Sequence, residues 1–327
     1  MTVNVELFNS LDAVEADAGG ALGRERQRCP YSRLGWFRLT QAFAPPEGEL
    51  LVARAVDGPR RAWLFLAVNG RKGVSYGSWY SLRMGTIGEP KLISDLAEAL
   101  KSKVQSVHLT RVEDAEAVAD GFRAAGWKVF TRDDTANWQV DTAGDDFATY
   151  WSKRPGRLRN TAKRKAKAAR LKIEVHRSFD PEAWAAYEEI YSRSWKPGEG
   201  SPEFLRAYAE QEGAAGTLRL GIARKDDRPI AAQLWTVEDG TATIHKLAYD
   251  EAAKELSPGT VLGVEMFRHV LDVDKAARID YGTGDDAYKR EWMDERRMLS
   301  AIDAYNPKTV GGLLATLREL ARRLLRR

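Results

Sequence analysis

The second half of the chain alternates between segments with strand-like and helix-like spacing of apolar residues. Three runs, 217–224, 230–237 and 241–249, are separated by Asp- and Gly-containing turns and predict an antiparallel meander. Apolar residues at helical spacing then predict an amphipathic helix over 258–273, and a strand follows over 277–282. This order of elements predicts an α/β domain.

Capping residues mark further helices in this half. Asp180 before Pro181, and Ser201 before Pro202, are typical helix starts because the side chain accepts a first-turn N–H and proline needs no donor there. The remaining predicted elements are a basic helix over 154–171, helices over 181–195, 202–212 and 286–294, and a strand over 298–305.

The first half repeats this outline more weakly. Its predicted turns at Asp57 and Asn69 have nearly the same spacing as those at Asp226 and Asp239, which indicates an internal duplication. The predicted elements are strands over 49–56, 61–68, 73–79, 106–111 and 127–133, and helices over 92–102 and 114–125.

The predicted helix at 258 begins with Ser257-Pro258-Gly259-Thr260. The Ser257 hydroxyl can accept from a first-turn N–H, and Gly259 lets a ligand approach the backbone closely. Unpaired N–H groups of Gly259, Thr260 and Val261, together with the positive end of the helix dipole, would favour a diphosphate. The same residues also make an ordinary helix start, so a simple cap is the alternative.

Five segments of the second half carry a family resemblance: 159–164, 228–233, 246–250, 256–260 and 280–292. In this order they resemble the BioF2-like (CelD/BcsL-type) acetyltransferases of the GNAT superfamily and, more distantly, the FemAB peptidyltransferases. The resemblance implies an α/β fold of two tandem GNAT-like (acyl-CoA N-acyltransferase) domains with mixed, mostly antiparallel sheets flanked by helices. The helix start lacks the usual Gln/Arg-x-x-Gly-x-Gly/Ala pattern of the superfamily.

By this resemblance, an acyl thioester lies between two diverging strands and an amine attacks it directly. Backbone N–H groups around Lys246, Leu247 and Ala248 would stabilise the carbonyl oxygen as it becomes anionic. Tyr288 occupies the place of the leaving-group acid, with packing of its ring against a helix as the alternative.

The candidate general bases are Asp285 or Asp286, at the end of a predicted strand, and then His245, whose ordinary pKa suits the task. A helix cap and a hydrogen-bonded sheet histidine are the respective alternatives. Lys289 is expected to hold the cofactor phosphates or an acidic substrate group, and an ordinary surface lysine is the alternative.

Five residues are expected to bind the acceptor substrate. Arg159 and Arg164 lie on the basic helix and would meet an anion. Trp195 opens a glycine-containing segment that would close over the substrate, and a purely structural tryptophan is the alternative. Gln233 and Trp292 complete the set through the resemblance.

Composition narrows the class of protein. A chain of 327 residues with 43% hydrophobic content and 10 Trp is long enough for two domains with cores. Cys29 is the only cysteine and the four histidines are scattered, so we expect no disulfide and no metal site. The longest apolar run, 62–68, is too short for a membrane span, and 1–20 has no leader pattern. We expect a cytoplasmic protein.

Positive charge is concentrated in two places. Residues 153–172 carry ten basic side chains and no acid, so a nearby anion is expected: cofactor phosphates, lipid phosphate, a diphosphate-linked sugar precursor or tRNA. Residues 310–327 combine apolar side chains at helical spacing with five arginines. This pattern is typical of an interfacial helix on an anionic membrane, and docking on its own domain is the alternative.

We therefore expect a degenerate GNAT-like domain over 1–143, an acyltransferase domain over 144–309 and a basic amphipathic helix over 310–327. The expected donor is an acyl-CoA or acyl carrier protein thioester, and no metal is needed. The expected acceptor is a lipid- or sugar-linked amine near the inner membrane, such as a sphingoid-type amine or an envelope aminosugar. The alternatives are a FemAB-type aminoacyl-tRNA-dependent transferase and a catalytically silent scaffold that binds an acyl carrier or a membrane.

Overall fold

The chain folds into two compact units. The computed structural model describes residues 3–325. Unit 1 comprises the chain up to Thr135 and from Met298 onward, and unit 2 is Ala136–Arg297. The chain enters unit 2 within β7 (Lys128–Asp141) and returns to unit 1 within β13 (Glu295–Tyr305).

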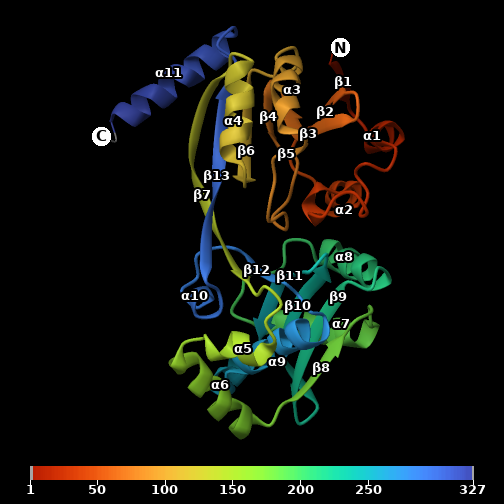
Figure 1. Ribbon diagram of the computed structural model, residues 1–327, viewed down its shortest axis with the longest axis vertical. Coiled ribbons are helices and arrows are strands. Elements are labelled where there is room, and N and C mark those ends of the chain that lie inside the picture. The colour runs from red at the N-terminus through yellow and green to blue at the C-terminus, as the bar shows by residue number, and fades with distance from the viewer. Residues whose placement is uncertain (1–2, 326–327) are drawn as a thin grey trace. The chain divides into compact units, whose positions relative to one another are not determined.

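Unit 1 is a mixed sheet with helices on both faces (Figure 1). Its strand order is β1-β2-β3-β4-β6-β13, with β5 paired to β3, and its ladders are antiparallel except for the parallel pair of β4 and β6. The strands that lie wholly within it are β1 (Asn4–Phe8), β2 (Glu49–Asp57), β3 (Arg60–Asn69), β4 (Lys72–Ser75), β5 (Thr86–Gly88) and β6 (Ser106–Val112). The helices are α1 (Leu11–Ala18), α2 (Leu34–Phe43), α3 (Ile93–Leu100), α4 (Ala115–Ala124) and α11 (Val310–Leu324), with 3-10 turns at Pro30–Ser32 and Pro90–Leu92.

The two cores of unit 1 follow from the period-two alternation of β3. Leu64 and Leu66 point into the core that α3 and α4 cover. Trp63 and Phe65 point to the opposite face, where α1 and α2 pack and Phe65 stacks on Phe37 with ring centroids 3.8 Å apart. Because helices cover both faces of the sheet, the middle of β3 is a continuous run of apolar residues.

Unit 2 repeats the same plan. Its strand order is β7-β12-β11-β10-β9-β8, and β11 pairs with β12 in parallel while the other ladders are antiparallel. The other strands are β8 (Lys172–His176), β9 (Leu218–Lys225), β10 (Arg228–Glu238), β11 (Thr241–Tyr249) and β12 (Arg278–Thr283). The helices are α5 (Phe147–Ser152), α6 (Gly156–Ala169), α7 (Pro181–Ser192), α8 (Pro202–Ala214), α9 (Pro258–Arg268) and α10 (Lys289–Trp292), with a 3-10 helix at Glu251–Leu256 and a π-helical turn at His269–Val273.

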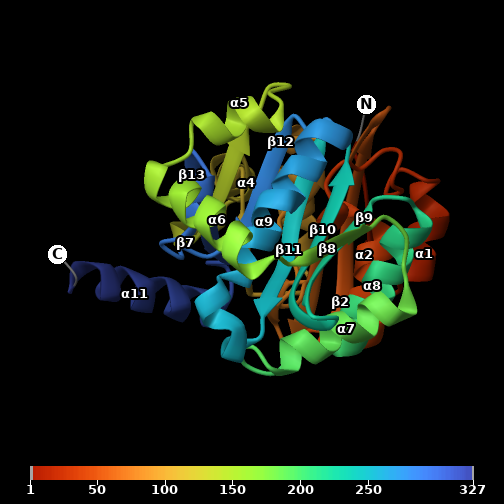
Figure 2. The same ribbon diagram turned by 90° about the horizontal axis from the view of Figure 1, so that it is seen from below.

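Helix α9 lies across β10 and β11 and fills the main core of unit 2 (Figure 2). Phe267 is at the centre of this core, with its ring centroid 5.2 Å from that of Tyr150 and 5.1 Å from that of Trp235. Trp292 approaches the same ring at 4.8 Å. These aromatic contacts fix α9 on the sheet, and α9 in turn positions the residues at its own start.

Replacing Phe267 with alanine should lower the free energy of unfolding by about 3 to 5 kcal/mol, since Phe267 is 1% exposed and its loss leaves a cavity among packed rings. Thermal or denaturant unfolding of unit 2 measures this. Val264→Ala on the same helix removes a partly buried side chain and serves as the control. Equal effects of the two changes would contradict the central position of Phe267.

The expected fold class is confirmed. In each unit, three antiparallel strands lead to a short parallel pair, β2-β3-β4 with β6 and β9-β10-β11 with β12. The expected division at residues 143 and 309 differs from the observed units. Residues 298–305 were expected in the second domain, but β13 pairs with β6 of unit 1, with Ile302 opposite Leu109.

Several predicted bounds also differ. The basic helix begins at Gly156, and Arg154 lies before it, 5% exposed and paired with Asp294 at 2.7 Å. The helix predicted over 286–294 is only the four residues of α10, and β4 ends at Ser75 instead of residue 79. Six elements have no counterpart among the predicted segments: β1, α1, α2, β5, β8 and α5.

Candidate active site

Strands β11 and β12 diverge after three paired residues. The parallel ladder joins Thr241 to Arg278 and ends where Thr243 meets Asp280, whereas β11 continues to Tyr249. On its other side β11 stays paired with β10, with a bulge at His245 because Leu234 is opposite Lys246 and Trp235 is opposite Ile244. We call the space between the diverging strands the β11–β12 opening. Among the described residues, no ladder pairs β11 on this side beyond Thr243.

The helix start after β11 differs in detail from the prediction. Helix α9 begins at Pro258 as expected, but Ser257 has φ 50° and its side chain makes no cap hydrogen bond. The N–H groups of Thr260 and Val261 both donate to the Ser257 carbonyl, each at 3.1 Å, so the prediction that they are unpaired is wrong. Within residues 3–325, the Gly259 N–H has no such partner. An anion here would meet the helix dipole and one free amide.

The segment after β12 brings Tyr288 to the opening. The Tyr288 ring packs edge-on against Tyr281, at 5.7 Å, and Tyr281 immediately follows the last residue of β12 that pairs with β11. Burial, and then the charge of Asp286, raises the pKa of the Tyr288 hydroxyl. The side chain is still 40% exposed, and its hydroxyl has no hydrogen bond within the described chain.

The neighbouring charged residues have different surroundings. Asp285 forms an ion pair with Arg296 at 2.7 Å and accepts from the Trp138 indole at 3.1 Å. Hydrogen bonding from Arg296 lowers the pKa of Asp285, which makes it a weaker base. Asp286 is largely exposed, with its carboxylate 3.8 Å from the Lys289 ammonium.

Lys289 does not extend towards a ligand. Its side chain is buried, and the ammonium donates to the Thr283 carbonyl at 2.6 Å. It also lies 5.6 Å from the centre of the Tyr281 ring, and burial lowers its pKa. The expected contact with cofactor phosphates is therefore not supported; Lys289 instead fixes the turn between β12 and α10.

His245 and Lys246 lie next to each other on β11 but have different partners. The His245 Nε2 atom lies 2.8 Å from Thr236 Oγ1 and 3.3 Å from the Tyr208 hydroxyl, and burial lowers the His245 pKa to about 4. An imidazole with this pKa is a poor base for an ammonium proton. Lys246 forms an ion pair with Glu199 at 2.9 Å.

Two residues that the sequence analysis did not select lie beside Lys246. Glu199 and Lys196 come from the segment between α7 and α8, and burial lowers the Lys196 pKa to about 8. The charges that act on Lys196 include those of Lys246 and of Asp286, which come from opposite sides of the β11–β12 opening. This arrangement defines a polar cluster at the opening: Lys196, Glu199, Lys246 and Asp286.

A cavity of about 390 Å³ adjoins this cluster. Its walls combine aromatic rings from α7 with residues of the following segment, and we call it the Tyr191 cavity. Burial raises the pKa of the Tyr191 hydroxyl to about 12, so this group stays neutral and can donate a hydrogen bond. The lining residues are Trp184, Tyr187, Glu188, Tyr191, Ser192, Lys196, Gly198, Glu199, Pro202 and Leu205.

The other predicted substrate contacts separate into buried and exposed groups. Gln233 is 4% exposed and its amide donates to the Gly259 carbonyl at 3.1 Å, so it ties α9 to β10. Trp292 is buried in the core beside Phe267. Trp195 is exposed, with its ring 4.3 Å from Tyr249 at the end of β11. Of these three, only Trp195 is accessible to a substrate.

The predicted basic helix presents an unpaired cationic face. Arg159 and Lys163 line a cavity of about 560 Å³ between α6 and α9, whereas Lys165 donates to the Glu255 carbonyl. Several exposed side chains of this segment have no acidic partner among residues 3–325. They are Arg157, Arg159, Lys163, Arg164, Lys167 and Arg170.

Helix α11 has its apolar side turned outward. Its buried residues are Gly312, Thr316 and Glu319, while Leu317 is 53% exposed and Leu320 46% exposed. The helix therefore contacts unit 1 through these small and polar residues and through Arg323, which donates to the Thr131 carbonyl at 3.1 Å, and its leucines stay exposed. Arg326 and Arg327 of the predicted tail lie outside the described residues. No helix in the described part of the chain is long and apolar enough to cross a membrane.

Comparison with known proteins agrees with this geometry. Residues 152–290 match the family model for an acetyltransferase (GNAT) domain. The chain has the GNAT fold. The match extends from α5 to α10 and so contains the β11–β12 opening, the start of α9 and Tyr288. The narrower BioF2-like assignment remains a proposal. No curated protein sequence matches the chain.

Several solved structures with the same fold align with residues of both units. A tandem GNAT protein from the clavulanic acid biosynthesis pathway is 13% identical, with a TM-score of 0.53 and coverage of 94% of this chain and 99% of that one. FemX is 10% identical, with a TM-score of 0.57 and coverage of 84% and 96%. The C-terminal domain assigned to a lysylphosphatidylglycerol synthetase of Agrobacterium fabrum is 16% identical, with a TM-score of 0.52 and coverage of 81% and 85%. At these identities the likeness concerns the fold.

Proposed function

We propose that the protein is an acyl-CoA-dependent N-acyltransferase and that the reaction takes place in unit 2. The β11–β12 opening carries this proposal, because an extended acyl thioester needs backbone donors along one side and open space along the other. Helix α9 starts shortly after β11 ends, and its dipole favours the donor's diphosphate there. An acyl carrier protein would present the same thioester, so it is the second form of donor to test.

The reaction needs a nucleophile, an oxyanion donor and a leaving-group acid. The acceptor amine attacks the thioester carbon, and backbone N–H groups near Lys246, Leu247 and Ala248 stabilise the resulting oxyanion. The C–S bond then breaks, and Tyr288 donates its proton to the departing sulfur. The raised pKa of Tyr288 is compatible with this role because the same surroundings also desolvate the thiolate and raise its affinity for a proton.

We assign the base to Lys196 in preference to the aspartates and His245. An amine must lose a proton during the reaction, and an effective base has a pKa near the working pH. Lys196, with a pKa of about 8, meets this condition, whereas hydrogen bonding weakens Asp285 and burial weakens His245. Lys196 also lines the Tyr191 cavity, where the acceptor would enter. Asp286 remains the alternative base.

The Tyr191 cavity supports an amine carried on a sugar or on an apolar chain. Trp184, Tyr187 and Tyr191 offer ring faces that suit either kind of acceptor. A sphingoid-type long-chain amine and an envelope aminosugar are therefore the two acceptor classes to compare. Native mass spectrometry with a panel of acyl-CoAs, followed by a coupled thiol-release assay with both amines, tests donor and acceptor separately. Failure to bind any acyl-CoA or acyl carrier protein would remove the proposal.

We further propose that α11 contacts an anionic membrane surface. Its exposed leucines form one apolar face, and Arg318, Arg322 and Arg323 accompany it. Changing Leu317 and Leu320 to serine should lower vesicle partitioning about tenfold or more, because apolar burial is lost from the bound state. Flotation with anionic vesicles measures this.

Val273→Ser is the control for the membrane experiment, since it removes an exposed apolar side chain of unit 2. If the leucine variant floats as well as the unchanged protein, α11 is not the membrane contact. Conversion of a concentration-dependent dimer to a monomer by the leucine changes would assign the same face to a second copy and overturn the membrane proposal.

The cationic face of α6 supports one alternative, a FemAB-type transferase that uses aminoacyl-tRNA. Its unpaired arginines and lysines suit a phosphate backbone, and such binding weakens steeply with salt. Titration of tRNA at several salt concentrations distinguishes the two. Tight, salt-dependent tRNA binding without acyl-CoA binding would favour the alternative.

A further inference from the structure

Unit 1 contains a pocket of about 320 Å³ at the end of its own parallel strand pair. The ladder between β4 and β6 ends where Val74 meets His108. The pocket is lined by Ser75, the last residue of β4, and by Val112 and Glu113 at the end of β6. This is the topological position that the β11–β12 opening has in unit 2. We call it the Trp36 pocket.

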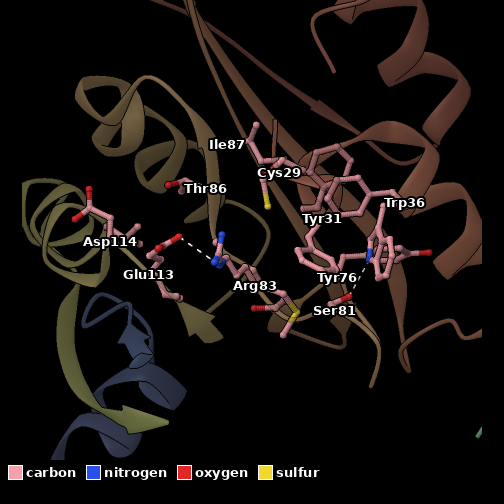
Figure 3. Close-up of a pocket in the computed structure, with 18 residues that line it drawn as sticks. Cys29, Tyr31, Trp36, Tyr76, Ser81, Arg83, Thr86, Ile87, Glu113 and Asp114 are labelled. Atoms are coloured by element: carbon pink, nitrogen blue, oxygen red, sulfur yellow. Dashed lines mark hydrogen bonds and ion pairs between the residues drawn. The ribbon is translucent and has the colours of Figure 1, made fainter. Parts of the chain in front are cut away.

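Aromatic side chains form one side of the Trp36 pocket. Figure 3 shows Tyr31, Trp36 and Tyr76 grouped on this side. Trp36 is 3% exposed and packs edge-on against Tyr31 at 4.7 Å, and the stacked rings of Phe37 and Phe65 also line the pocket. These walls offer flat apolar surfaces to a ring.

Charged groups form the opposite side. Arg83 and Glu113 lie together in Figure 3, with a nitrogen–oxygen distance of 3.5 Å, and Asp114 lies beyond them. The two side chains of the pair are 25% and 46% exposed, so both are accessible at the mouth. A guanidinium has five donors and a carboxylate several lone pairs, so each can keep its partner and still bind a ligand group of opposite charge.

The segment that follows β4 closes the Trp36 pocket, and in this the pocket differs from the β11–β12 opening of unit 2. Residues 76–85 fold over it, held by the Trp36 indole that donates to Ser81 Oγ at 3.0 Å and by the Arg111 guanidinium that donates to the Ser78 carbonyl at 3.2 Å. The Met84 N–H also donates to the Arg111 carbonyl at 3.0 Å. The chain then forms β5, which pairs with β3, so α3 begins only at Ile93, well beyond the end of β4. A compact ligand fits this enclosure better than coenzyme A does.

We propose that the Trp36 pocket binds a small zwitterion with a flat apolar body, of the class of aromatic α-amino acids. Its carboxylate would meet Arg83, its ammonium would meet Glu113, and its ring would lie against Trp36 and Tyr76. Arg83 and Glu113 carry opposite charges at the mouth of the Trp36 pocket. They therefore favour a ligand that carries one positive and one negative charge. This binding does not depend on acyl transfer in unit 2.

Cys29 offers a site-specific measurement, because it lines the pocket and is the only cysteine of the chain. Burial raises the pKa of its thiol, so alkylation is followed at mildly alkaline pH by intact mass spectrometry. L-Phenylalanine or L-tryptophan at ten times its Kd should slow alkylation about tenfold. Phenylpropionate and phenethylamine, which each lack one ionic group, should bind about tenfold or more weakly.

Substitutions provide the second arm of this test. Arg83→Gln and Glu113→Gln should each weaken protection by the amino acids, while Arg60→Gln, an exposed arginine of the same unit, should not. Protection that is absent, or equal for the amino acids and both analogues, would overturn the proposal. Protection by acetyl-CoA instead would make the pocket a donor site and would also overturn it.

Discussion

Replacing Tyr288 with phenylalanine is expected to lower kcat by about 10²- to 10⁴-fold, the usual contribution of a positioned acid or base. The departing sulfur would then lose its proton donor while every apolar contact of the ring is retained. Affinity for the acyl-CoA should change little, because the hydroxyl acts mainly in the transition state. Steady-state kinetics with a thiol-release assay, together with direct donor titration, measures both quantities.

Tyr281→Phe is the matched control for this experiment. Tyr281 packs against Tyr288 at 5.7 Å, but it belongs to the core of unit 2 and is only 8% exposed. Its hydroxyl is therefore less able to reach the donor. An unchanged kcat in Tyr288→Phe would remove Tyr288 from the mechanism, and equal losses in both variants would indicate a structural cause.

Replacing Lys196 with methionine should also lower kcat by about 10²- to 10⁴-fold and should remove one limb of the pH profile. The Lys196 pKa of about 8 lies below the ordinary lysine value, so the neutral amine becomes the major form as the pH rises through 8. A base must be neutral to accept the proton. The rate of the unchanged protein should therefore increase with pH and level off above about 8.

Two further variants separate chemistry from charge at Lys196. Lys196→Arg keeps the positive charge but cannot act as the base, so it should be as slow as Lys196→Met. Lys225→Met removes a lysine in the hairpin of β9 and β10 and should leave kcat unchanged. If Lys196→Arg keeps the full kcat, or if Lys196→Met keeps the pH dependence of kcat, Lys196 is not the general base. The role of base would then be assigned to Asp286.

The strands and helices of the fold were predictable where apolar periodicity was regular. The meander of β9, β10 and β11 and the start of α9 at Pro258 lie close to their predicted bounds because turns and a proline delimit them. The pairing of β13 with β6 could not be predicted, since its register joins Ile302 to Leu109 across a long sequence separation. That pairing is the reason that residues 298–305 belong to unit 1.

The candidate site was only partly predictable from the sequence. Lys246 and Asp286, which lie on opposite sides of the β11–β12 opening, could be predicted from the sequence, but Lys196 and Glu199 could not. These two residues become informative only through burial and the 2.9 Å ion pair of Glu199 with Lys246. The only sequence signal was their place in the segment that begins with Trp195, which was already expected to approach the substrate.

The terminal helix shows the limit of amphipathic patterns. The spacing of its leucines predicts an apolar face but does not say whether that face packs inward. In the structure, glycine sets the direction: a Cβ at Gly312 would lie 2.1 Å from the Asn306 carbonyl oxygen, so this side of α11 approaches the backbone closely. The leucines consequently remain exposed.

A crystal structure with bound coenzyme A would locate the acyl donor directly. We expect the pantetheine arm between β11 and β12, the thiol near Tyr288 and the diphosphate at the Gly259 N–H, where α9 begins. Coenzyme A bound elsewhere, with the β11–β12 opening empty, would show that acyl transfer does not take place at this opening.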